Sequence, residues 1–222
     1  MTDQDSRLRR VLDAIDAASA QDPNLIEGPE REPGSSSRVP AGLLYGQRMS
    51  ATLDAFAPGA SEALAIAVRG QHIERWTTPR GTYPIGRAGY LRWRNDLKAY
   101  HARRLAEIMA THGYDEAMIA RVGALVRKER LKQDAEAQTL EDVACLVFLT
   151  HYLPGFAAGE AEAPMDDDKL AGVLAKTWRK MSPKGQAAAA SLPLAPRVRA
   201  LLEAGLAGLD AARGQAGAPA AG

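Results

Sequence analysis

The sequence has few of the residues and patterns on which several large protein classes depend. Its single cysteine, Cys145, lies in the apolar run VACLVFL, so no internal disulfide can form and a buried thiol is the simplest interpretation. No apolar run approaches the ~20 residues that a membrane-spanning helix needs, and the first residues, MTDQDSRLRR, do not resemble a signal peptide. We therefore expect a cytoplasmic protein with no membrane partner.

An excess of charge of one sign is also missing. The chain has 28 Lys and Arg against 27 Asp and Glu, which gives a formal net charge of +1. No global field therefore draws the chain to nucleic acid or anionic lipid, and any basic binding surface must be local. No segment alternates apolar and polar residues over a strand's length, and no glycine-rich phosphate loop is present, which excludes a Rossmann or P-loop core.

Helical periodicity, by contrast, runs through most of the chain. Leu8, Val11, Leu12 and Ile15 recur at intervals of three and four residues, which predicts a helix over residues 5–20. Apolar spacing, capping residues and helix-initiating prolines predict eight more helices. These begin at Pro40, Ser61, Asp115, Thr139 and Ser182, or cover residues 88–112, 167–181 and 195–211. The expected fold is an all-α, single-domain bundle of eight or nine helices.

The predicted domain organisation has four parts. Residues 1–27 form an N-terminal helical segment, and residues 28–38, rich in Gly, Pro and Ser, form a flexible insert. Residues 39–211 form the helical core, and residues 212–222 have no groups to pack and are expected to be disordered.

Unusual side chains concentrate in the thirty-one residues from Gln71 to His101. This stretch holds two His, two Trp, three Tyr, five Arg and one Lys, in a chain with 5% aromatic residues and four His in total. Arg and aromatic side chains combine large contact area, planar hydrogen bonding and stacking. We therefore predict a ligand site here.

His72 and His101 are the candidate acid–base or metal-binding groups of this stretch. His72 ends a buried helix, where a core histidine is one interpretation, but the neighbouring polar residues favour a ligand. His101 shares one helix face with Arg94 and Lys98, and a merely solvated face is the alternative there.

A group of arginines forms the cationic part of the predicted site. Their guanidinium groups suit a carboxylate, phosphate or sulfate, because the planar fork binds such anions through two hydrogen bonds. The predicted ligand-binding residues are Arg75, Trp76, Arg80, Arg87, Arg92, Arg94 and Lys98. The expected partner is an anionic small molecule.

Several long strings resemble an uncharacterised family catalogued as domain of unknown function 4202. They are LLYGQRM, QHIERW, YLRWRNDLKAYH, LKQDAEAQTLEDVACLVFL and TWRKMS, and the resemblance covers about residues 6–205. It implies an all-helical fold and no established activity. Some members of this family are labelled glutamyl-tRNA synthetase, and residues 180–184, KMSPK, resemble the KMSKS loop of those enzymes. The missing Rossmann strands speak against aminoacylation, and Ser182-Pro183 is also a normal helix start.

A weaker similarity at the level of the fold links the chain to the HD superfamily of metal-dependent phosphohydrolases. That similarity implies a metal site in which His72, His101 and Asp142 take part. The chain departs from the superfamily because Ile73 stands where the signature aspartate belongs, and the first histidine is absent near Gln47. Asp142 also has a structural interpretation. It falls in the first turn of a predicted helix, where an acidic side chain complements the positive end of the helix dipole.

Two functional hypotheses follow. In the first, the chain is a phosphohydrolase-like enzyme on a small phosphorylated or nucleotide-like ligand. His72, His101 and Asp142 would act in catalysis or hold a divalent metal. In the second, the same basic and aromatic surface binds an anionic ligand or RNA without chemistry.

Overall fold

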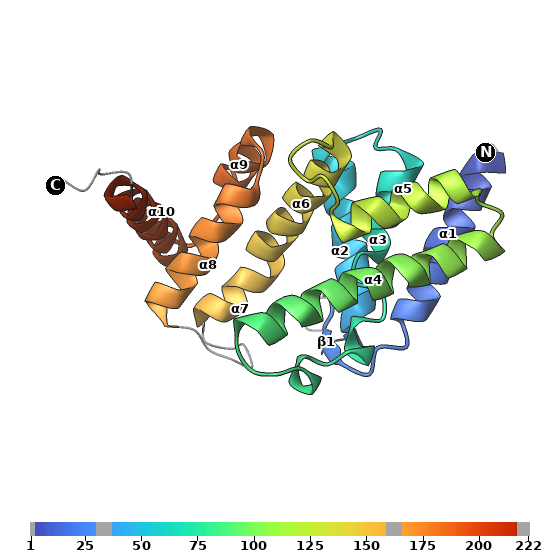
Figure 1. The fold of residues 1–222 in the computed structure, drawn as a ribbon, viewed down its shortest axis with the longest axis horizontal. Helices are drawn as coiled ribbons and strands as arrows, with labels where there is room; N and C mark the ends of the chain where they lie inside the picture. The colour runs from blue at the N-terminus through green and yellow to red at the C-terminus, as the bar shows by residue number, and fades with distance from the viewer. Residues whose placement is uncertain (1–2, 30–36, 159–165, 217–222) are drawn as a thin grey trace. The chain divides into compact units, whose positions relative to one another are not determined.

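The computed structural model describes residues 3–29, 37–158 and 166–216, and most of them are helical (Figure 1). The elements are α1 (Asp3–Ser19), β1 (Leu25–Glu27), β2 (Arg38–Pro40), α2 (Ala41–Phe56), α3 (Glu62–Gly70), η1 (Arg75–Thr77), η2 (Arg80–Thr82), α4 (Arg87–Thr111), α5 (Glu116–Arg127), α6 (Ala135–Val147), η3 (Phe148–Tyr152), α7 (Leu153–Ala158), α8 (Asp167–Lys180), α9 (Pro183–Ala190) and α10 (Pro196–Ala216). Elements η1 and η2 are single 3-10 turns, and η3 is a π-helical turn. None of the helices in this described part is long and apolar enough to cross a bilayer.

The prediction of a mostly helical fold is confirmed, with two differences. Ten α-helices are present among the described residues, and β1 pairs with β2 in an antiparallel hairpin. Each strand has only three residues, too few to show an alternating pattern in the sequence. Of the predicted flexible insert, residues 30–36 lie outside the described residues. At the other end, α10 runs to Ala216, past the expected end at 211, and residues 217–222 lie outside the described residues.

The described chain divides into two compact units, residues 1–140 and 141–222, and the boundary falls within α6. In the first unit α3 is central, because it packs against α1, α2 and α5 and buries six of its nine residues. Gly70, at the end of α3, lies so close to α4 that an added Cβ would be 2.4 Å from the Leu105 side chain. The small residue therefore lets the end of α3 approach α4 closely.

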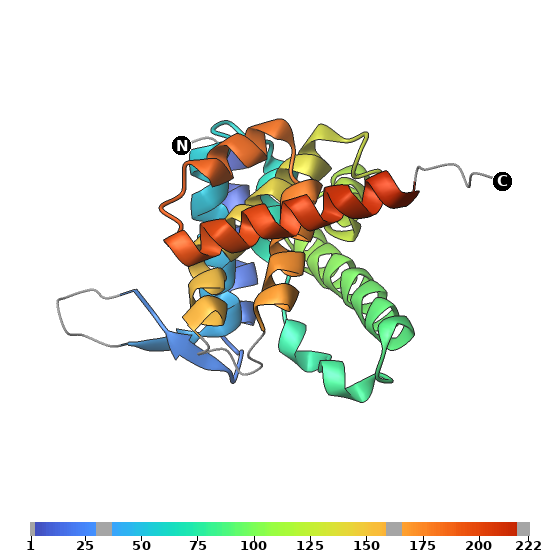
Figure 2. The same cartoon turned by 90° about the vertical axis from the view of Figure 1, so that its left-hand side faces the viewer.

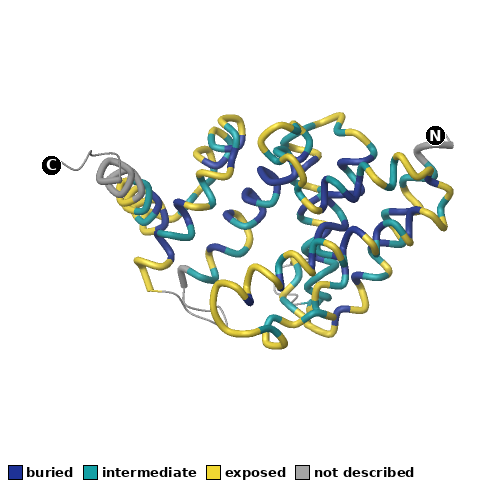
Figure 3. Tube along the Cα trace, in the orientation of Figure 1, coloured by how far each residue is buried: buried dark blue, intermediate teal, exposed yellow. Residues whose placement is uncertain are grey.

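Helix α4 is the longest helix of the first unit, with 25 residues. Six of its eight buried residues, among them Trp93, Leu97 and Leu105, recur every four residues, so burial alternates along the tube in Figure 3. The helix ends where expected, because Gly113 has a φ of 76°, the left-handed conformation common after a helix C-terminus.

Three of the predicted helix caps are confirmed. The side chains of Ser61, Asp115 and Ser182 each accept a hydrogen bond from a backbone N–H three residues later. Such caps are predictable because donor and acceptor are close in sequence.

The helix start predicted at Thr139 is wrong. Helix α6 begins four residues earlier, and Asp134 accepts hydrogen bonds from the N–H groups of Glu136 and Ala137. Thr139 lies inside the helix and donates its hydroxyl to the Ala135 carbonyl. Asp134 and Thr139 are both of residue types that cap helices. The Asp134 carboxylate is the better acceptor and helical residues follow it directly, so Asp134 caps the helix.

The π-helical turn η3 interrupts the run from α6 to α7 for an identifiable reason. The Leu153 N–H donates to the carbonyl of Phe148, five residues earlier, which widens the turn. The next residue, Pro154, has no N–H and its ring conflicts with the carbonyl four residues before it.

In the second unit α8 packs against α10. An added Cβ on Gly205 of α10 would lie 2.3 Å from the Ala171 carbonyl oxygen, so the two helices approach closely at this point. Gly208, one turn later, has no atom within 4 Å of the corresponding position.

This difference predicts opposite effects for two alanine substitutions on α10. Gly205→Ala should lower the free energy of unfolding by about 1–3 kcal/mol, because its methyl group meets backbone. Gly208→Ala should raise it by up to about 1 kcal/mol through helix propensity. Urea unfolding of both variants and the parent measures this, and equal effects would contradict the close approach.

Candidate functional site

A pair of histidines lies where the end of α3 meets the middle of α4. The rings of His72 and His101 have centroids 5.9 Å apart. His101 is buried, with 2% of its surface exposed, and its Nδ1 is 2.7 Å from the Ile73 carbonyl oxygen. A carbonyl only accepts, so Nδ1 carries the proton and donates. The opposite nitrogen, Nε2, is buried and has no hydrogen-bond partner among the residues that the structure describes.

The His72 ring is held by a stacking contact. It lies on the Tyr45 ring of α2, with centroids 4.6 Å apart and an interplanar angle of 15°. The Tyr45 hydroxyl accepts a hydrogen bond of 2.6 Å from the Nε2 of buried Gln71, which fixes the tyrosine in turn. Helix α2 thus sets the orientation of a side chain that follows α3.

Both histidines are neutral at pH 7. Burial lowers the pKa of His101 from 6.5 to about 4, against the opposing effect of its hydrogen bond to Ile73. The pKa of His72 is held well below its usual value, first by burial and then by the charge of Arg75. His101, Lys128 and Arg94 lower the His72 pKa further. Imidazoles in this state are proton acceptors and potential metal ligands.

Glu74, which lies between His72 and Arg75 in the sequence, has an unusual backbone conformation. Its φ of 50° and ψ of 32° place a non-glycine residue in the left-handed region, which is strained. Its carboxylate accepts a hydrogen bond of 2.6 Å from the Tyr100 hydroxyl and two of 3.0 and 3.1 Å from Arg104 Nε. Helix α4 therefore anchors the turn that leads from His72 to Arg75.

Two arginines of the site lie on aromatic rings. The Arg75 guanidinium is 4.7 Å from the centre of the Trp93 ring, and that of Arg94 is 5.7 Å from the Tyr90 ring. The Trp93 ring is fixed because its Nε1 donates to the Thr78 carbonyl at 2.9 Å. Stacking leaves the edge of a guanidinium, with its N–H groups, available for an anion.

Two predicted ligand residues have structural roles. Arg80 donates to the carbonyls of Tyr83 and Pro84, both at 3.0 Å, and to that of Gly86 at 3.5 Å, so it closes its own loop. Trp76 lies against the first turn of α2, where its ring would be 3.1 Å from a Cβ added to Gly42.

The other cations predicted for the site lie along α4. Arg87 is exposed and forms no ion pair with a described residue, and Arg92 is 3.8 Å from Asp96 with most of its side chain in solvent. Lys98 is half-buried. The residues that the structure brings together are therefore His72, His101, Arg75 and Arg94.

Asp142 belongs to the second unit, where it accepts two hydrogen bonds from Ser182. The Ser182 N–H is 2.8 Å from Oδ1, and the Ser182 hydroxyl is 2.5 Å from Oδ2. The same hydroxyl caps α9, which gives the serine of the KMSPK string a structural role. Across the described ranges no three His, Cys, Asp or Glu side chains gather into a group able to hold a metal ion.

Sequence reasoning missed four residues of this site. Tyr45 lies in the string LLYGQRM, but nothing there indicates a contact with a histidine 27 residues later. Gln71 and Glu74 adjoin His72 in sequence, which is a usable signal. Lys128 follows the last turn of α5, where a cation also suits the helix C-terminus, so its sequence position gives no sign that it lowers the His72 pKa.

Fold and site together define a helical protein with a buried, neutral histidine pair beside stacked arginines. The sequence profile of the domain of unknown function DUF4202 matches residues 9–202, most of the chain. The chain therefore belongs to this family, as its resemblance predicted. No curated protein and no solved structure matches it.

The pKa of His101 predicts how stability depends on pH. Its folded-state pKa of about 4 lies below the ordinary 6.5, so the stabilisation is complete above pH 6.5 and is lost as the pH falls toward 4. The loss is about 3 kcal/mol for this group. Urea unfolding at pH 7 and pH 4, with a chelator present so that no metal ion is bound, should show a smaller decrease for His101→Gln than for the parent. Equal decreases would show that His101 is not buried in the neutral form.

Proposed function

We propose that this chain binds a small phosphorylated or nucleotide-like molecule beside His72 and His101 and hydrolyses its phosphate ester with a divalent metal ion. The observation that carries the proposal is the buried Nε2 of His101. A buried polar atom without a partner needs a reason, and an ion or a bound ligand is one. The ring of His72 lies near it, with 5.9 Å between the two ring centroids, and burial favours the neutral form of that imidazole as well.

The chemistry of the two imidazoles fits a metal of the zinc, iron or manganese type. Histidines that bind metals almost always donate their other ring N–H to a carboxylate or a backbone carbonyl, as His101 does to Ile73. A divalent ion held there would polarise a phosphate oxygen and activate a water molecule. Asp142 lies in the second unit and has a structural role there, since each of its oxygens accepts a hydrogen bond from Ser182.

The charges around His72 support an anionic ligand. Arg75, Lys128 and Arg94 all act on this histidine strongly enough to lower its pKa, so the surrounding potential is positive. A phosphate group would find guanidinium donors there, and its negative charge would offset their mutual repulsion.

The second candidate function is binding without catalysis, to a small anion or to RNA. It is favoured by the absence of a three-residue metal group among the described residues. In that case the arginines and Lys128 would provide the affinity, and the exposed ring of Tyr90 would stack on a base.

Metal analysis of tag-free protein tests the main proposal. The parent should carry close to one transition-metal ion per chain, and His72→Ala and His101→Gln should lose it with more than a tenfold decrease in occupancy. His112→Gln is the matched control, because His112 Nδ1 also donates to a backbone carbonyl, that of Ile108. Phosphate release from nucleotides and sugar phosphates should follow metal content across these proteins.

Other results would reject the proposal. A parent that carries no metal and stays inactive when zinc, manganese or iron is added would remove the hydrolase function. Binding to single-stranded RNA that falls steeply with added salt and is lost in Arg75→Ala would then support the second function. Metal loss in His112→Gln as well would show that the ion is not held by the histidine pair.

A further inference from the structure

The N-terminal end of α4 exposes apolar side chains in an unusual concentration. Four large apolar residues are exposed among the described residues, and three of them, Ile85, Tyr90 and Leu91, lie within seven positions. Ile85 is fully exposed, and Tyr90 and Leu91 show 43% and 48% of their surface. In Figure 2 this stretch is part of the teal-green hook at the start of α4. Grouped exposed apolar residues indicate an interaction site.

This apolar tip, residues 85–91, is rigidly built. Arg80 closes the preceding loop by donating to three backbone carbonyls. Gly89 lies against Pro84 so closely that a Cβ would be 1.9 Å from the Pro84 carbonyl oxygen. A preformed tip loses little conformational entropy when it binds. Arg87 on the tip is exposed and has no ion pair with the described residues, so the tip is basic as well as apolar.

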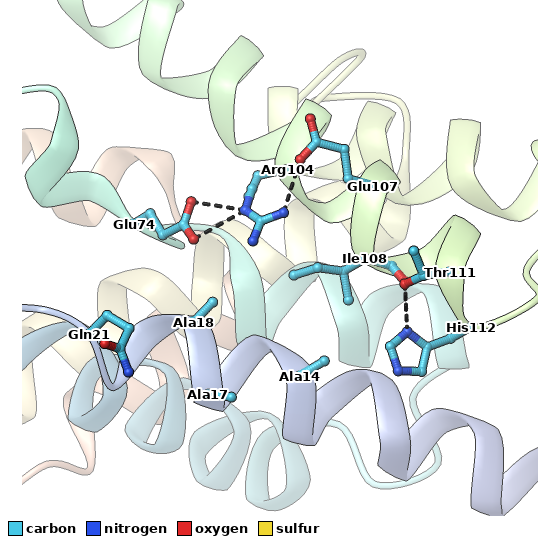
Figure 4. Close-up of a pocket in the computed structure, with 10 residues that line it drawn as sticks. All are labelled: Ala14, Ala17, Ala18, Gln21, Glu74, Arg104, Glu107, Ile108, Thr111 and His112. Carbon is cyan, nitrogen blue, oxygen red and sulfur yellow. Dashed lines mark hydrogen bonds and ion pairs between the residues drawn. The ribbon is translucent and has the colours of Figure 1, made fainter.

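The same unit contains a pocket of about 480 Å³ between α1 and α4 (Figure 4). Its apolar surface comes from Ala14, Ala17, Ala18 and Ile108. Two carboxylates, those of Glu74 and Glu107, face one guanidinium, that of Arg104, so the charged groups that line it are acidic on balance.

The tip and the pocket are complementary but cannot meet within one chain. Both lie along α4, and Arg87 and Glu107 are twenty residues apart on the same helix. At 1.5 Å per residue this separates them by about 30 Å, and a continuous helix cannot fold back on itself. The tip of one chain can reach such a pocket only on a second chain.

We infer that two copies of this chain pair with their α4 helices antiparallel, so that the tip of each copy occupies the α1–α4 pocket of the other. Ile85 packs on the alanine floor of the pocket, and Arg87 pairs with Glu107. Because each tip binds the pocket of the other copy, the assembly is a closed dimer with two-fold symmetry. The same contact occurs twice in it, which strengthens the association. A partner with a different sequence is not required, since both halves of the contact are on this chain.

Sedimentation velocity of the full chain between 1 and about 100 μM tests this dimer, and the concentrations span the range in which weak dimers form. The parent should sediment as a dimer at the upper end, and Ile85→Asp should weaken the dimer at least tenfold. Leu25→Asp is the control, because Leu25 is also an exposed large apolar residue, with 44% of its surface in solvent, but lies on β1. A monomeric parent, or a dimer that survives Ile85→Asp, would overturn the inference.

Mixing two charge-reversed variants distinguishes reciprocal exchange from any other dimer. Arg87→Glu and Glu107→Lys should each be mainly monomeric alone, because like charges meet in both contacts. Their equimolar mixture should dimerise like the parent, since one contact then pairs Glu with Lys and the other keeps Arg with Glu. Circular dichroism melts of both variants establish that they are folded. No recovery on mixing two folded variants would overturn the reciprocal contact.

Discussion

The hydrogen bond from His101 Nδ1 to the Ile73 carbonyl connects the two halves of the candidate site. It ties the middle of α4 to the chain that leaves α3, within a region where His101 is almost completely buried. It also fixes which ring nitrogen carries the proton, so Nε2 is left as an acceptor. Tyr100 and Arg104 hold the left-handed turn at Glu74. This turn keeps the Ile73 carbonyl next to Arg75.

The arrangement of charges around this bond raises the free energy of the folded protein when no ligand is bound. Two imidazoles are kept neutral, one is flanked by several cations, and one buried nitrogen has no partner among the described residues. Groups left unpaired in a buried site usually reflect a function that supplies the missing partner. An anion would offset the surrounding positive charge, and a metal ion bound together with an anion would occupy the unpaired nitrogen. Ligand binding is therefore the common element of both proposed functions.

Helix α4 has two roles in this account. Its middle provides His101 and the ring of Trp93 to the site, and its ends provide the apolar tip and part of the pocket. A straight helix of 25 residues separates these features by a fixed distance. The family match covers residues 9–202, and a fold or family by itself does not specify a function, which depends on the side chains of the site.

The sequence by itself determined the helical class, most helix limits and the caps at Ser61, Asp115 and Ser182, because these depend on groups within a few residues of one another. It also located the stretch that carries the histidine pair. Only the tertiary structure decided which side chains meet. Tyr45 reaches His72, Arg80 turns to its own loop, and Asp142 accepts from Ser182, 40 residues away. Periodicity assigns a residue to a helix face. Its contacts, however, depend on how helices distant in the sequence pack together, and the local spacing of residues does not determine that packing.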